Sequence, residues 1–139
     1  MGKVVWKKTV VWFLCGAVIY PVIELLWRGH SHWSMALAGG ACTVLLLFLN
    51  GLFPALARPV RALIGGGLIC TVEFLFGAVF NLLLGLAIWD YSGLSFHIMG
   101  QVSLRYFLLW CGFSYLLPFL FDRVWEATDI REEIFRAAV

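Results

Sequence analysis

Four long stretches of the chain consist almost entirely of apolar residues, and short polar segments separate them. They cover about residues 9–27, 33–57, 62–89 and 100–121. A helix needs about 20 mainly apolar residues to cross a bilayer, and each stretch is near or above that length. None alternates between apolar and polar residues as the strands of a membrane barrel do. The pattern predicts an all-α, polytopic membrane protein with four transmembrane helices in a bundle.

The chain after residue 121 has a different pattern, because charged residues of both signs interrupt the apolar ones. Apolar residues still recur there at helical spacing, namely Ala127, Ile130, Ile134 and Ala138. We therefore predict one transmembrane domain over residues 1–121. Residues 122–139 are predicted to form a cytoplasmic tail with a short amphipathic helix, which lies on the membrane or against a partner.

The basic residues distinguish the two sides of the predicted membrane domain. Eight of them lie before the first stretch, between the second and third, or after the fourth, whereas only Arg28 and Arg105 lie on the opposite side. Segments rich in Lys and Arg favour the cytoplasmic side of a membrane. We therefore predict that both termini are cytoplasmic and that the segments near Arg28 and Arg105 lie at the outer side.

Composition agrees with a membrane location and argues against several other classes. Hydrophobic residues make up 63% of the 139 residues and charged residues 13%, which is more apolar surface than a soluble domain of this size can bury. The net charge of +2 provides no basic face for nucleic acid. The four cysteines show no C-x-x-C spacing, so no metal centre or cofactor is predicted, and membrane lipids are the expected surroundings.

Polar residues within and beside the apolar stretches gather in the predicted outer half of the bilayer. Because polar groups are costly in lipid, each is a candidate for function. We expect these residues to line a polar cavity that binds substrate: Glu24, Arg28, His30, His32, Asn81, Asp90, Tyr91, Gln101 and Arg105. The two histidines form an H-x-H pattern, which in a loop is too weak a signal to predict a metal site.

Glu24 and Arg28 are separated by four residues and can form an ion pair on one helix face. This pair is either part of a functional site or an interfacial ion pair that ends the helix. Arg105 lies at a similar predicted depth, so we expect it to pair with Glu24 or with Asp90.

Glu73 lies deeper than the other polar residues, about 24 Å below Trp89 if the helix is continuous. No basic residue of the sequence falls at its level, so we expect the side chain to be uncharged at neutral pH. Glu73, Gly77, Asn81 and Gly85 recur every four residues and form one helix stripe. Glu73 is therefore a candidate proton gate, and the alternative is a neutral side chain that hydrogen-bonds across a helix interface.

Three tryptophans indicate where the outer membrane interface lies. Trp27, Trp33 and Trp89 stand at predicted outer ends of the apolar stretches. Tryptophan is enriched at the boundary between lipid and water, so we expect all three to form an aromatic belt.

Several of these residues also form a pattern that resembles a known family. The motif YPVIELLWRGHSHWSM of residues 20–35, with Gly39-Gly40 after it, resembles the CmpB-like family of small bacterial membrane proteins, which are classed as ABC-transporter permeases. A second set of residues fits the same pattern: Glu73, Asn81, Trp89-Asp90-Tyr91-Ser92, Gly100-Gln101 and Trp110. Arg105 departs from the family pattern, in which this position is usually not basic.

The resemblance implies a permease-like protein of the bacterial cytoplasmic (plasma) membrane. An ABC system needs a nucleotide-binding subunit, and this chain has no G-x-x-x-x-G-K-[ST] motif, so such a subunit would be supplied in trans. The inner loop of about five residues is short for docking that subunit, which leaves the tail as the available contact.

From these features we predict a transport protein that binds or moves a small polar solute or ion. Four helices enclose little space for a pathway, so a homo-oligomer is expected. One alternative is a membrane-embedded enzyme, although no spacing of a nucleophile and a base supports it and no catalytic residue is predicted. The other is a structural or regulatory subunit of a larger membrane complex.

Overall fold

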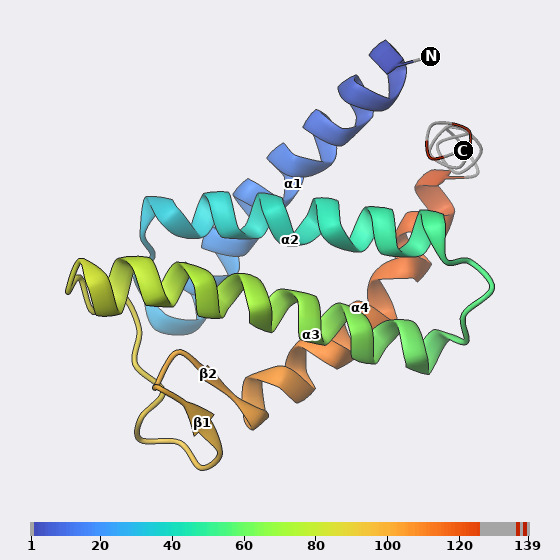
Figure 1. The fold of residues 1–139 in the computed structure, drawn as a ribbon. Coiled ribbons are helices and arrows are strands. Elements are labelled where there is room, and N and C mark those ends of the chain that lie inside the picture. The colour runs from blue at the N-terminus through green and yellow to red at the C-terminus, as the bar shows by residue number, and fades with distance from the viewer. Residues whose placement is uncertain (1, 126–135, 137, 139) are drawn as a thin grey trace.

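A computed structural model describes residues 2–125, 136 and 138 of the chain. Its elements, in chain order, are α1 (Gly2–Arg28), α2 (Trp33–Leu52), α3 (Arg58–Gly77), the π-helix η1 (Ala78–Leu83), β1 (His97–Ile98), β2 (Val102–Ser103) and α4 (Leu104–Trp125) (Figure 1). The two strands pair antiparallel as a minimal hairpin. The predicted all-α class is confirmed. Most of the predicted amphipathic tail, residues 126–135, lies outside the described residues.

Three of the described helical segments are long and apolar enough to cross a membrane: Thr9–Arg28, Trp33–Leu52 and Arg58–Leu83. They correspond to the first three predicted spans. The fourth predicted span overlaps α4, which forms a further helix of 22 residues.

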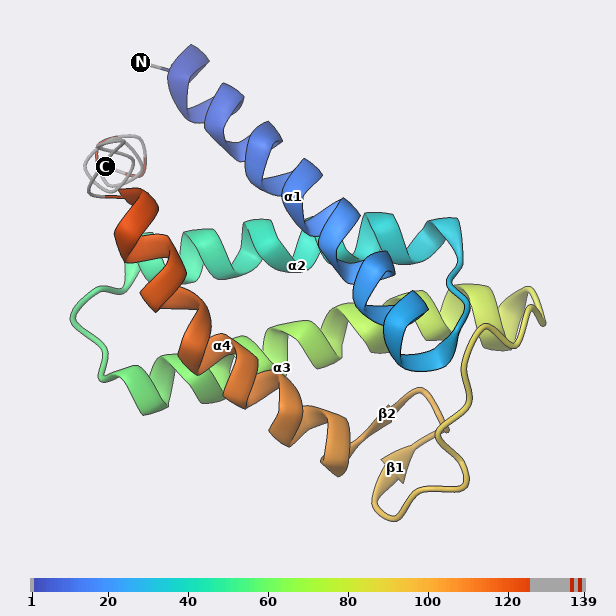
Figure 2. The same ribbon diagram turned by 180° about the vertical axis from the view of Figure 1, so that it is seen from behind.

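The helices pack as two pairs, α1 on α2 and α3 on α4, and α2 lies beside α3 (Figures 1 and 2). Glycines allow both pairs to approach closely. A Cβ atom on Gly16 of α1 would collide with Thr43 of α2, and one on Gly65 of α3 would collide with Ser114 of α4. Small residues at such positions are typical of helix contacts in membranes, where close backbone approach increases dispersion contacts.

The core of the described chain is built on α2 and the facing side of α3. Its most enclosed side chains are Met35, Leu46 and Leu47 of α2 and Ile69 of α3. By contrast, α1 keeps large apolar residues such as Leu14 and Val18 exposed. Lipid solvates such residues at no cost, so this exposure is consistent with a membrane environment.

The connections lie at two ends of the molecule. The N-terminus, the α2–α3 connection and the end of α4 lie at one end, and the α1–α2 loop and the hairpin lie at the other (Figures 1 and 2). The segments predicted to be external therefore share one end, which we call the hairpin end.

Helix ends differ from the prediction in three places. The second helix ends at Leu52 and not at residue 57, because Phe53 precedes Pro54 and adopts a non-helical conformation, with φ −120° and ψ 53°. The third ends at Leu83 and not at Trp89, because Gly85 takes a positive φ of 66° and the chain turns back. The fourth begins at Leu104 and not at Gly100, since Gly100, with φ 70°, lies in the turn between the strands.

Trp89 is a further correction, because it does not belong to an aromatic belt. Its side chain is only 6% exposed, and its indole N–H donates a hydrogen bond to the backbone oxygen of Gln101 at 3.0 Å. Trp27 and Trp33 are 72% and 63% exposed, as interface residues are expected to be. The chain that turns back after Leu83 thus returns Trp89 to the protein interior.

Candidate functional site

The hairpin end of α1 carries three polar side chains at intervals of four residues, Tyr20, Glu24 and Arg28, so they share one helix face. Arg28 donates to Oε1 of Glu24 and forms an ion pair with it. Ser31 in the following loop donates to Oε2 of the same carboxylate at 2.7 Å. Both carboxylate oxygens of Glu24 are therefore partnered within this segment.

Arg105 is not part of this cluster, so the expectation that it pairs with Glu24 or Asp90 is wrong. It lies exposed in the first turn of α4, and it forms no ion pair among the described residues. Asp90 instead accepts hydrogen bonds from the backbone N–H and the hydroxyl of Ser92, at 2.8 and 2.9 Å. Those two hydrogen bonds lower the pKa of the Asp90 carboxyl and so favour its ionised form. The same two hydrogen bonds hold the turn from Asp90 to Ser92.

Glu73 contacts a side chain that sequence reasoning did not identify. The phenol of Tyr20 on α1 donates to Oε1 of Glu73 on α3 at 3.0 Å. Glu73 is only 4% exposed, and its other carboxyl oxygen, Oε2, is buried without a hydrogen-bond partner among the described residues. Tyr20 lies four positions before Glu24 on the same helix face, and this spacing could have identified it as a further polar candidate.

Trp110 on α4 completes the surroundings of this carboxyl group. Its ring stacks on Tyr20 with a centroid distance of 5.7 Å and an interplanar angle of 24°. The indole lies beside the Glu73 carboxyl. However, its N–H, like Oε2 of Glu73, lacks a hydrogen bond of normal geometry. We call Tyr20, Glu73 and Trp110 the buried carboxyl cluster. It connects α1, α3 and α4 and includes one unused acceptor and one unused donor.

Asn81 and Gln101 lie together and hold the chain after Leu83 against the π-helix. Asn81 donates to the side-chain oxygen of Gln101 at 2.8 Å and to the backbone oxygen of Trp89 at 3.0 Å, and it accepts from the N–H of Ile88 at 2.7 Å. Gln101 is 3% exposed and packs directly on Gly77. The Asn81 side chain thus provides hydrogen-bond partners for the backbone N–H of Ile88 and the backbone oxygen of Trp89, which lie in a non-helical segment. Inside a membrane, such backbone groups must find their partners within the protein.

We expect Asn81→Leu to destabilise the chain by about 1 to 3 kcal/mol, because it leaves the buried Gln101 oxygen and the Ile88 N–H without partners. Thermal unfolding of the purified protein in detergent measures this loss. The matched control is Asn50→Leu, since the amide of Asn50 donates only to Leu46 one turn earlier on its own helix, at 2.8 Å. Equal losses in the two variants would contradict the assigned role of Asn81.

The remaining predicted residues also lie at the hairpin end. His32 caps α2, where its Nδ1 accepts from the Ser34 N–H at 3.3 Å, and its ring packs against Trp33 and Phe80. His30 is exposed and contacts the backbone oxygen of Arg28. Tyr91 stacks on Tyr106 at 4.4 Å, and burial raises the pKa of its phenol. Within the described residues, no group of three His, Cys, Asp or Glu side chains is arranged to bind a metal ion.

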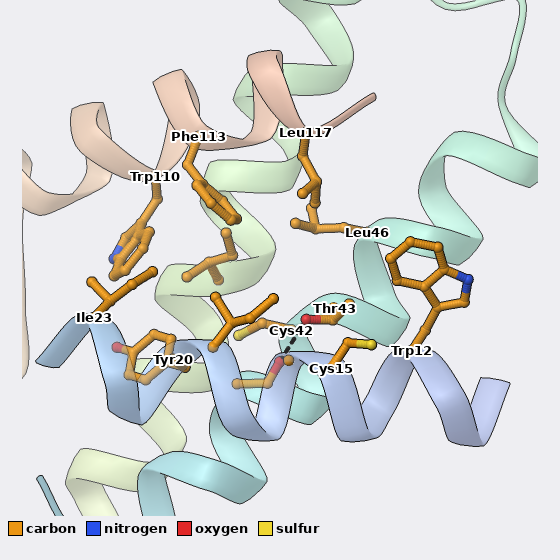
Figure 3. A pocket seen from close by; sticks show the side chains of 14 residues that line it. Trp12, Cys15, Tyr20, Ile23, Cys42, Thr43, Leu46, Trp110, Phe113 and Leu117 are labelled. Carbon is orange, nitrogen blue, oxygen red and sulfur yellow. Dashed lines mark hydrogen bonds between the residues drawn. The ribbon is translucent and has the colours of Figure 1, made fainter. Parts of the chain in front are cut away.

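A cleft separates α1 from α4 (Figure 3), and we call it the α1–α4 cleft. Tyr20 and Trp110 lie at one end of it, and Trp12 and Leu117 lie toward the other. Its volume is about 560 Å³, including its opening. The side chains around it are almost all apolar, and none of the polar residues predicted to bind substrate lines it.

Comparison of the chain with known protein families gives a match. The family described as "Putative ABC-transporter type IV", the CmpB family, matches residues 36–137. The chain belongs to this family. The CmpB-like match includes Glu73, Asn81, Gln101 and Trp110, whereas Glu24 and Arg28 precede it. No curated protein and no solved structure shows significant similarity to the chain.

The CmpB-like assignment and the three apolar helices together identify a membrane protein of a transport-related family. Within it, the structure combines an ion pair at the hairpin end of α1 with a buried carboxyl cluster deeper between the helices.

Proposed function

We propose that this CmpB-like chain is a membrane transport protein that binds or moves a small polar solute or ion. One observation carries the proposal. Glu73 lies in a helix long enough to cross a membrane and is 4% exposed. One of its carboxyl oxygens accepts a hydrogen bond from Tyr20, and the other has no hydrogen-bond partner among the described residues. A carboxyl group is costly at such a position, and carboxyl groups that persist inside membranes commonly serve ion or proton movement.

In this proposal Glu73 takes up and releases a proton as the transported species binds and leaves. The Glu24–Arg28 pair lies one turn beyond Tyr20 on the same face of α1, so it forms the polar route from the hairpin end to the buried carboxyl cluster. The remaining candidates for contact with the solute at that end are His30, His32, Asp90, Tyr91 and Arg105. Asn81 and Gln101 contribute by fixing the loop that borders the route.

We further propose that α4 is a fourth membrane span and that the hairpin end faces outward, with both termini in the cytoplasm of a bacterium. The positions of the connections support this, because the start of α1, the end of α4 and the α2–α3 connection lie at one end. The basic residues near that end support the same orientation. Since four helices enclose little space, the working form is a homo-oligomer. The family description supports a nucleotide-binding subunit in trans.

Reconstitution of the purified full-length chain into vesicles tests transport. The vesicles contain a pH-sensitive dye, and gradients of sodium, potassium, glycine or glycerol are imposed one at a time. We expect at least one of these probes to cause a pH change that empty vesicles do not show. If every probe gives the rate of empty vesicles while the chain co-purifies with other membrane subunits, the transport proposal is wrong and a structural or regulatory role replaces it.

A further inference from the structure

We propose that the α1–α4 cleft binds a lipophilic organic cation, a positively charged group that carries aromatic or alkyl substituents. This inference rests on the proposed function, because it names the class of ion that the chain binds or moves. It follows from three features, which are the aromatic walls of the cleft, a carboxyl group beside one of those walls, and the opening of the cleft at the side.

Aromatic side chains make up much of the cleft wall. Trp12 and Tyr20 contribute from α1, and Trp110 and Phe113 contribute from α4 (Figure 3). The faces of such rings attract organic cations, with a preference for Trp and Tyr, and the attraction is larger where water is excluded. The other lining residues are aliphatic or small, so they suit the apolar substituents of the same molecule.

The titratable group beside the cleft is an acid. Among the described residues, no Lys, Arg or His lines the cleft. Glu73 does not line the cleft but accepts a hydrogen bond from the hydroxyl of Tyr20, which does, and its Oε2 has no hydrogen-bond partner among the described residues. Arg28, two turns beyond Tyr20 on α1, is paired with Glu24. A cation in the cleft would therefore favour the ionised form of this carboxyl group, to which it would be attracted across the Tyr20 side chain in surroundings of low dielectric.

The opening of the cleft allows entry from the lipid. Cys15, Ile19 and Ile23 on α1 and Phe113 on α4 border it and are all exposed. The stacked rings of Tyr20 and Trp110 lie at one end of the cleft. Lipophilic cations dissolve in membranes, so a cleft that opens between two helices is accessible to them without passage through a polar pore.

A neutral lipid chain is the alternative occupant of these apolar walls, but it would not be attracted by the Glu73 carboxyl group beside Tyr20.

Two ions of nearly identical shape and opposite charge provide the test. Radiolabelled tetraphenylphosphonium and tetraphenylborate are dialysed against the purified full-length chain. We expect the cation to bind more tightly than the anion by about tenfold or more, because only the cation is attracted by Glu73 and the ring faces. Glu73→Gln should remove most of this preference, whereas Asp122→Asn, which changes a carboxyl group near the C-terminal end of α4, should retain it.

Cys15 provides a second measurement that needs no variant at Glu73. It lines the cleft and is exposed, so N-ethylmaleimide can modify it. Tetraphenylphosphonium should slow this modification, and tetraphenylborate at the same concentration should not.

Equal binding or equal protection by the two ions would overturn the inference, since it indicates an apolar site that lipid chains occupy. Absence of binding by either ion would overturn it as well. If either result accompanied solute-driven pH changes in vesicles, the proposed transport function would stand without this ligand class. Cation binding without any vesicle transport would support the site and count against the transport function alone.

Discussion

A cysteine that replaces His30 will react with a membrane-impermeant maleimide added to intact cells, whereas one that replaces Ala57 will react only after the cells are broken. His30 lies exposed in the loop at the hairpin end, and Ala57 lies exposed in the α2–α3 connection at the opposite end. Eight of the ten basic residues lie, in the sequence, before the first apolar stretch, between the second and third or after the fourth, and Ala57 belongs to the second of these segments, which favours its retention in the cytoplasm. The expected difference in labelling is close to all or none.

Both variants should also carry Cys15→Ser, because Cys15 is the native cysteine that the structure shows as exposed. This background without an added cysteine serves as the control for unspecific labelling. Labelling of the Ala57 variant from outside, together with protection of the His30 variant until lysis, would reverse the orientation. The polar route to Glu73 would then open toward the cytoplasm.

The apolar stretches predicted the helices well, because the physical requirement behind them is local. A run of about 20 apolar residues has few options in lipid other than a helix. The end of α2 was also readable in principle, since Phe53 precedes Pro54 and a residue before proline avoids the helical conformation. The Glu24–Arg28 pair could be predicted because its members are neighbours on one turn.

The end of the third helix could not be read from hydropathy, because the chain from Leu84 to Trp89 remains largely apolar after the helix has ended. The reversal depends on Asn81, whose side chain binds Ile88 and Trp89, and on contact with Gln101, twenty residues further along. Such contacts depend on tertiary structure. The same reason explains why the burial of Trp89 was missed.

The buried carboxyl cluster also depends on tertiary contacts that the sequence does not show. Sequence reasoning singled out Glu73 from its depth and from the absence of basic residues at that level. Its partner Tyr20 is 53 residues away, and Trp110 arrives from a third helix. Depth along a helix can be estimated from the rise per residue, but the pairing of helices cannot, and Arg105 was assigned to the wrong partner for that reason.

The central claim is that Glu73 is the group that exchanges a proton during transport. Glu73→Gln preserves the size of the side chain and can still accept the hydrogen bond from Tyr20, but it cannot titrate. Its effect therefore separates proton exchange from a structural hydrogen bond across the α1–α3 contact. Glu24→Gln is the matched control, since it changes a carboxyl group in the ion pair at the hairpin end.

The decisive measurement is flux in reconstituted vesicles as a function of pH, for the wild-type chain and the two variants. Elution volume and thermal stability establish first that each variant is folded. We expect folded Glu73→Gln to lose pH-driven flux completely, and Glu24→Gln to keep a pH dependence of the same form. A folded Glu73→Gln that retains the wild-type pH dependence would contradict the account and leave Glu73 as a structural residue.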